Sequence, residues 1–447
     1  MSPLVLLPLL VLGQTHSRWE ASVRAEVRAR TASPQDDSTV AAADAELRPS
    51  LSGAIFNGPW TLSGSYRPTF RSREFYSPRV KGQAIGEHSH VGQVEAVWVK
   101  EASARAFIGQ FVNYGTLDLS TLTREPGSTG AATPTPTPQI PAVRTGLGVV
   151  RELTFDTTAG VDWYLTRRVT LTTTAGFTYG GGADVASRAS LPLGSTWRGG
   201  ARLAWLASVR DTLAINLAAQ YVRFFQVAAT PQMPVANPGA RIVIAELSGF
   251  YARVLGERTG ADLVLGATAT FGQLPNLDPM AMGTFRSASG VAPLVGVGLN
   301  HRVLIPAQQL DFRIGGQLAP FVDRFAGTVY QRLEGNVSLA WRHVRHVSAS
   351  IGAGVSRSIP GGTEAPLTTV FGDAGIGYAG DPWWRVDLTG RTSLNQAGTP
   401  ALPSPLPAPM PPAAPAWSGA PALEKQWVVG LSLTLIAASE QPRTFRE

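Results

Sequence analysis

Two histidines, His88 and His90, have the residue type and the spacing of a metal site. Alternate positions of a strand share one face, so both imidazoles would point the same way. A closed metal site needs about four ligands, yet no other histidine is near and the chain has no cysteine. Glu87 is only their neighbour in sequence. We therefore interpret the two histidines as a solvated loop pair, and we expect no metal and no cofactor.

A second pattern has the spacing of a dinucleotide-binding loop. The segment Gly375-Ile376-Gly377-Tyr378-Ala379-Gly380 has glycines at the required positions, but that loop needs a helix to follow and hold phosphate at its N-terminus. Asp381-Pro382-Trp383-Trp384 follows instead. We interpret these glycines as strand residues running into a turn. No serine, histidine and aspartate arrangement for nucleophilic catalysis stands out.

The elements that would position any site are indicated by an alternation of apolar and polar residues with period two. In 19–30, tryptophan, alanine and valine occupy the odd positions, and glutamate, serine and arginine occupy the even ones. The same alternation returns near 43–55, 152–163, 169–179, 202–210, 385–391 and 427–435. The chain is therefore predicted to be all-β, with one apolar face and one charged face on each strand.

Connections between the strand candidates alternate in length. We count about 18 candidates, with 16 as the alternative. Short links lie near 57–59, 101–102, 166–168, 210–211, 256–258, 305–307, 343–346 and 381–382. Long links lie near 30–40, 71–87, 117–147, 180–195, 226–239, 272–290 and 394–423. Short periplasmic turns alternating with long outer loops are typical of a closed antiparallel transmembrane β-barrel. Because a spanning sheet cannot leave an unpaired edge in lipid, the strand near Trp19 should pair with the strand near Trp427.

Other sequence features agree with a barrel. No segment has the roughly 18 consecutive apolar residues of a membrane helix. Tryptophans and tyrosines fall mostly near strand ends, where they would form interfacial girdles. We interpret 1–17 as a signal peptide, 18–438 as the barrel and 439–447 as a polar periplasmic tail. The proline-rich tracts 133–138 and 400–421 are expected in outer loops.

The charged face should line the interior, because an arginine at the bilayer midplane would cost about 2–4 kcal/mol on the lipid side. Twelve of these residues are the candidates for setting the selectivity of a pore: Arg24, Glu26, Arg28, Asp44, Glu46, Arg48, Arg202, Arg332, Glu334, Arg385, Asp387 and Arg391. The same parity turns inward Glu20, Glu95, Glu152, Asp156, Asp162, Asp311 and Arg313.

We expect the first, second and penultimate strands to be neighbours on closure, so that a ladder of arginines would face carboxylates. Two interpretations stay open. The ladder either creates a transverse field that favours polar solutes, or its ion pairs only hold the wall in register.

The net charge of +7 comes mostly from arginines scattered along the chain. This distribution suits bidentate contacts to phosphate or carboxylate groups, as on lipopolysaccharide, and it does not indicate nucleic acid. The turn near His343 and His346, with Arg342 and Arg345, is expected to contact a periplasmic partner or lipid phosphate.

The apolar N-terminal segment, the strands at 19–30 and 427–435, the Asn57-Gly58-Pro59 turn and the long loops resemble Gram-negative outer-membrane barrels. Size, strand count and the Ala/Arg/Pro-rich composition are similar to the porin-like barrels that myxobacteria pair with polysaccharide export proteins. This resemblance implies an outer-membrane pore for a secreted polymer and a periplasmic export protein as partner. Unlike the common outer-membrane pattern, the last strand is followed by 439–447 and lacks a terminal aromatic residue. The alternatives are a structural or adhesive barrel acting through its loops, and a hydrolase with a carboxylate pair inside the barrel.

Overall fold

The computed structural model describes 16–33, 40–77, 80–100, 103–118, 149–184, 187–188, 191–225, 239–275, 285–323, 328–343, 346–359, 367–381, 383–397 and 423–438. It contains 18 strands. They are β1 (His16–Ser33), β2 (Val40–Asn57), β3 (Trp60–Ser77), β4 (Val80–Lys100), β5 (Ala104–Asp118), β6 (Val149–Tyr164), β7 (Val169–Gly182), β8 (Gly194–Leu206), β9 (Asp211–Phe224), β10 (Ala240–Gly256), β11 (Thr259–Pro275), β12 (Phe285–Ile305), β13 (Gln308–Asp323), β14 (Thr328–His343), β15 (Val347–Ile359), β16 (Leu367–Asp381), β17 (Trp384–Ala397) and β18 (Leu423–Ala438).

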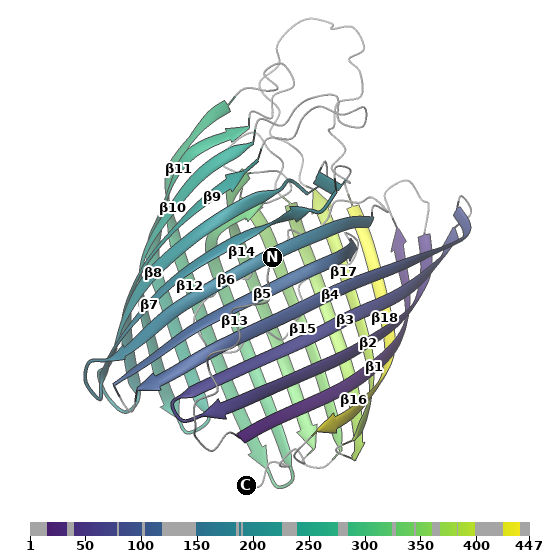
Figure 1. Ribbon diagram of the computed structural model, residues 1–447, viewed down its shortest axis with the longest axis horizontal. Helices are drawn as coiled ribbons and strands as arrows, with labels where there is room; N and C mark the ends of the chain where they lie inside the picture. The colour runs from purple at the N-terminus through teal and green to yellow at the C-terminus, as the bar shows by residue number, and fades with distance from the viewer. Residues whose placement is uncertain are drawn as a thin grey trace, which may run out of the picture.

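The 18 strands form one closed antiparallel barrel (Figure 1). Each strand pairs with its neighbours in the chain, and β1 also pairs with β18 over a register that runs from Glu20 opposite Ala438 to Ser33 opposite Lys425. The predicted strand number and the predicted pairing of first and last strands are confirmed. Closure gives every strand two partners, so the sheet has no edge with unpaired N–H and C=O groups.

The links at the two ends of the barrel differ in length. At one end, here called the turn end, even-numbered strands are joined to the next strand by tight turns, as at Gly58, whose φ of 56° suits glycine. At the other end, the loop end, the links include 119–148 and 398–422. The expected long link at 71–87 is wrong, because β3 continues to Ser77 and β4 begins at Val80. The alternation is hidden there because several outward positions are also polar, such as Ser72 and Glu74.

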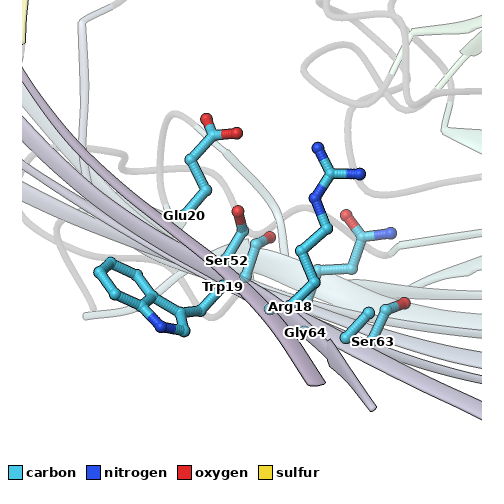
Figure 2. A pocket seen from close by; sticks show the side chains of 10 residues that line it. Arg18, Trp19, Glu20, Ser52, Ser63 and Gly64 are labelled. Carbon is cyan, nitrogen blue, oxygen red and sulfur yellow. The ribbon is translucent and has the colours of Figure 1, made fainter. Parts of the chain in front are cut away.

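The two faces of the wall differ as the alternation predicts. Large apolar side chains point outward and stay exposed, such as Val27 on β1 and Leu217 on β9. Carboxylates at the alternate, inward positions are buried, including Glu26, Asp44 and Glu46. Figure 2 shows the divide within one strand, where Trp19 points to one side of the wall and Arg18 and Glu20 to the other. Among the described residues, no helix is long and apolar enough to cross a membrane.

Tryptophans gather at the turn end on seven of the strands. They lie near the turn-end termini of their strands, at outward positions of the register: Trp19, Trp60, Trp98, Trp163, Trp205, Trp341 and Trp384. Trp60 and Trp98 contact each other on neighbouring strands, with ring centroids 6.2 Å apart. Amphipathic rings favour the boundary between hydrocarbon and headgroups, so this arrangement fits a membrane interface at the turn end.

The remaining sequence predictions have mixed outcomes. Gly375–Gly380 lies within β16, as expected for strand glycines. The histidine pair does not lie in a loop: His88 and His90 belong to β4 on the outer face, and His90 Nδ1 is 2.8 Å from the hydroxyl oxygen of Tyr66. Their polar flanks had suggested a loop. The proline-rich tracts, the tail 439–447 and 1–15 of the expected signal peptide lie outside the described residues, while His16 and Ser17 begin β1.

Candidate functional site in the barrel lumen

The most highly charged part of the inner wall is formed by the first four strands. Antiparallel pairing places Glu26 opposite Glu46 and Arg28 opposite Asp44. On the next pair of strands it places Arg71 opposite Glu87. We call the whole group the charge belt; it consists of Arg24, Glu26, Arg28, Asp44, Glu46, Arg48, Arg71, Arg73 and Glu87. Register therefore gathers on one patch of wall residues that are far apart in sequence.

Ion pairs connect the belt continuously. Glu46 is its centre and accepts from Arg28 Nη1 at 3.3 Å, from Arg71 Nη2 at 2.9 Å and from Arg48. Arg28 Nε lies 2.6 Å from Glu26 Oε1 on the same strand. Glu46 has two like-charged neighbours, Glu26 directly opposite it on β1 and Asp44 two residues away on β2. The surrounding guanidinium groups therefore make its burial tolerable.

Arg73 and Glu87 extend the belt toward β4. Arg73 Nε lies 2.9 Å from Asp44 Oδ1, and its Nη1 lies 3.3 Å from Glu87 Oε1. Arg71 Nη1 reaches the other oxygen of Glu87 at 3.3 Å. The sequence prediction missed Arg71, Arg73 and Glu87 because it placed them in a loop. Their spacing of two on a strand was the signal that could have found them.

Five arginines and four carboxylates make up the belt, so its formal charge is +1. The excess is concentrated at its turn-end edge, where Arg24 and Arg48 lie directly opposite each other. Their side chains are 34% and 30% exposed, whereas that of Glu46 is 0% exposed. The belt therefore turns arginine toward the lumen and covers its carboxylates. Ion pairs between neighbouring strands are what we expect if the charges hold the strands in register. A role of the belt in ion selectivity stays a prediction.

The expected contact between the first and penultimate strands is wrong. β18 separates β17 from β1, and it presents Ser432 and Thr434 between the two charged surfaces. Arg385 and Asp387 form their own ion pair at 2.6 Å on β17. Arg391 lies opposite Asp373 of β16. These residues share the inner face with the belt but do not belong to it, because the last strand must lie between them to close the barrel.

The other predicted lumen residues occupy separate places on the inner wall. Arg332 pairs with Glu334 at 2.7 Å and donates to Ser356 Oγ at 2.7 Å. Arg202 has no acidic partner within the described residues, and its guanidinium lies 4.8 Å from the ring centroid of Phe250. The wall is therefore a set of local clusters with one large belt.

One further cluster crosses β6, β7 and β8. Arg198 Nη2 lies 2.8 Å from Asp156 Oδ1, and Thr178 donates to the other oxygen of that carboxylate at 2.5 Å. Arg198 was not among the sequence candidates, although it has the inward parity of Arg202. Within the described residues, no group of three or more histidine, aspartate and glutamate side chains could hold a metal ion.

A closed barrel with an apolar outside and a charged inside is the context for the comparison with known families. The sequence profile of the EpsX exopolysaccharide export family matches 9–405 of the chain. The chain belongs to this family. It is a closed 18-stranded β-barrel in a family of exopolysaccharide export. A comparison with curated proteins gave no match.

Several solved structures are similar in fold to this EpsX-family chain. The FrpB iron transporter from Neisseria meningitidis has a TM-score of 0.47 and 8% identity, covering 84% of this chain and 63% of the transporter. OpdQ of Pseudomonas aeruginosa has a TM-score of 0.41 and 7% identity, covering 94% of this chain and 99% of OpdQ. OccK7 (OpdD) of the same species has a TM-score of 0.44 and 8% identity, with coverage of 95% and 99%.

The turn-end rim of the EpsX-family barrel is basic. Arg167 and Arg168 lie between β6 and β7, Arg210 lies before β9, and Arg258 lies between β10 and β11. His346, before β15, donates from its Nδ1 to the carbonyl oxygen of Ala379 at 2.8 Å. Arg345 lies outside the described residues. Against Asp211 and Glu257 at the same three links, these four arginines leave an excess of positive charge, which attracts anionic groups on a protein surface or on lipid phosphates.

Proposed function

We propose that the protein is an outer-membrane conduit through which an exopolysaccharide chain leaves the cell, with its turn end in the periplasm. The observation that supports this proposal is the closed 18-stranded wall, which is apolar outside and hydrophilic inside, in a member of an exopolysaccharide export family. Barrels of 16–18 strands enclose an aqueous channel of the kind that hydrated polymers need. The turn end would be periplasmic because outer-membrane barrels keep their short turns on that side.

Conduction, not catalysis, is the proposed role of the lumen. The belt carboxylates are each engaged by arginines, as Glu46 and Glu87 show. A carboxylate held in this way is a weak proton donor or acceptor for acid–base chemistry. Charged groups that satisfy one another instead give a rigid, hydrated wall that a polyhydroxylated chain can slide along.

The test combines a cell assay with a biophysical one. Deleting the gene in the producing strain should abolish surface exopolysaccharide and leave the polymer or its precursors inside the envelope; a plasmid copy should restore export. The purified barrel should conduct ions in planar bilayers. Normal polymer export in the deletion strain would overturn the proposed function.

We further propose that the basic turn-end rim binds an acidic surface of a periplasmic export protein. Substituting Arg167, Arg168, Arg210 and Arg258 by glutamate should abolish co-purification with that partner while ion conductance persists. Retained co-purification, with altered binding of the barrel to anionic lipid, would assign the rim to lipid phosphate instead.

A further inference from the structure

Near the turn end, the ion-paired surface of the charge belt gives way to a hollow in the inner wall of β1–β4. Two rows of directly opposed residues cross the four strands here. One row is Arg18, Ala54, Ser63 and Glu95, and the next is Glu20, Ser52, Ser65 and Gln93. In both rows the long side chains stand on β1 and β4, and the small ones stand on β2 and β3. The wall therefore forms a trough with a serine and alanine floor, which we call the serine trough.

The dimensions of the serine trough fit an extended chain. Its two rims lie three strand spacings apart, which is about 14 Å at roughly 4.8 Å per spacing. A cavity of about 350 Å³ lies in it, lined by Arg18, Glu20, Ser52, Ser63, Ser65 and Gln93 among others. Figure 2 shows Arg18 and Glu20 rising on the same side of the wall above the serines. Because the floor follows β2 and β3, the trough runs along the strands.

The polar groups of the trough are free, unlike those of the charge belt. Arg18, Glu20 and Gln93 are exposed and make no hydrogen bond or ion pair within the described residues. Ser52, Ser63 and Ser65 likewise have no partner in the part of the chain that the structure describes. Farther along β1, by contrast, Glu26 and Arg28 pair with each other and with other members of the belt. Donors and acceptors that already serve the wall cannot bind a passing solute, whereas those of the trough can exchange water for one.

The chemistry of these free groups matches sugar hydroxyls. A hydroxyl both donates and accepts, so a chain of hexose units needs closely spaced partners of both kinds. Serine hydroxyls and the Gln93 amide do both, the Arg18 guanidinium only donates, and the Glu20 carboxylate only accepts. The floor is neutral, the β1 rim carries one charge of each sign, Arg18 and Glu20, and the β4 rim carries Glu95 and the neutral Gln93. The trough therefore does not require an anionic sugar, although Arg18 would accept one.

We propose that the serine trough is a saccharide-binding subsite at the periplasmic mouth, where a polymer chain first contacts the lumen wall. The subsite rests on the proposed function, since it needs the turn end to face the source of polymer. Each sugar contact is weak because it replaces a hydrogen bond to water, which suits a conduit that must release the chain as it advances.

Calorimetry on the purified barrel in detergent tests the proposal without requiring conduction. The probes are maltohexaose and oligosaccharides released by partial hydrolysis of the exopolysaccharide of the producing strain. The native barrel should bind at least one probe. The double variant Ser52→Ala and Ser65→Ala should bind it about tenfold more weakly, because two hydrogen-bonding groups are lost. Gln93→Ala, which removes a hydrogen-bonding amide from the β4 rim, should also weaken binding.

The matched control is Ser350→Ala, an exposed inner-wall serine on β15, which should leave affinity unchanged. Folding of every variant is checked by its heat-dependent mobility in gels. Absence of binding to the native barrel, or equal affinity of the native and double-variant barrels, overturns the subsite. The proposed function is judged separately, by loss of polymer export in the deletion strain and by ion conductance of the native barrel. If both are observed while sugar binding is absent, the proposed function stands and only the subsite fails.

Discussion

Arg73 Nε lies 2.9 Å from Asp44 Oδ1 across the β2–β3 pair, and both side chains are almost fully buried inside the barrel wall. The same arginine reaches Glu87 on β4, so one guanidinium joins three strands. Removing one member of a buried ion pair leaves the other without its counter-charge, which is far costlier than losing an exposed pair. This contrast gives the first prediction.

Asp44→Ala should destabilise the barrel by about 3–5 kcal/mol, measured by urea unfolding in lipid vesicles. The matched control is Asp387→Ala, whose partner Arg385 is half exposed, so the loss should be about 0–1 kcal/mol. Equal losses in the two variants would show that burial in the belt is not what makes its ion pairs important.

Ion selectivity should depend on the exposed arginines at the edge of the belt. Replacing Arg24 and Arg48 by glutamate changes the local charge by four units, and the reversal potential in a salt gradient should move toward cation preference. Arg253→Glu changes an outward-facing arginine near the turn end and should leave the reversal potential unchanged. An unchanged potential in the double variant would remove these residues from the selectivity set.

An arginine placed on the outer wall should cost more folding free energy near the middle of the membrane than near its surface. Leu217, in the middle of β9, is an exposed outward leucine, and Leu217→Arg should cost about 2–4 kcal/mol of folding free energy in a bilayer. Leu255, at the turn-end terminus of β10, is also exposed, and Leu255→Arg should cost about 0–1 kcal/mol. A reversed order would mean that lipid does not surround the wall as proposed.

Closure between β1 and β18 can be tested by a disulfide, because the chain has no native cysteine. Val27 lies directly opposite Leu431, so Val27→Cys with Leu431→Cys should cross-link under mild oxidation and lock the barrel against heating in detergent. Val27→Cys with Leu388→Cys should not cross-link, because β18 lies between the two strands. Cross-linking in the second pair alone would place β17 beside β1.

The sequence determined the wall of this protein. Alternation such as that of Trp19 to Arg30 assigns apolar residues to one face and charges to the other, because successive side chains of a strand point in opposite directions. Turn residues such as Asn57-Gly58-Pro59 then fix where each strand ends. Hydrophobic periodicity is a local property of the sequence. The number of strands, the side of the wall to which each residue points, and the closure of the barrel could therefore all be predicted from it.

Only the tertiary structure decided which charges meet. Glu46 and Arg71 are neighbours because of the β2–β3 register, and β18 separates Arg385 from Arg24. Neither fact can be predicted from local periodicity. The serine trough also escaped prediction, since Ser52 and Ser65 are ordinary residues until pairing aligns them between longer side chains. Cross-strand register depends on how the whole sheet closes, and the partners it brings together lie tens or hundreds of residues apart in the chain.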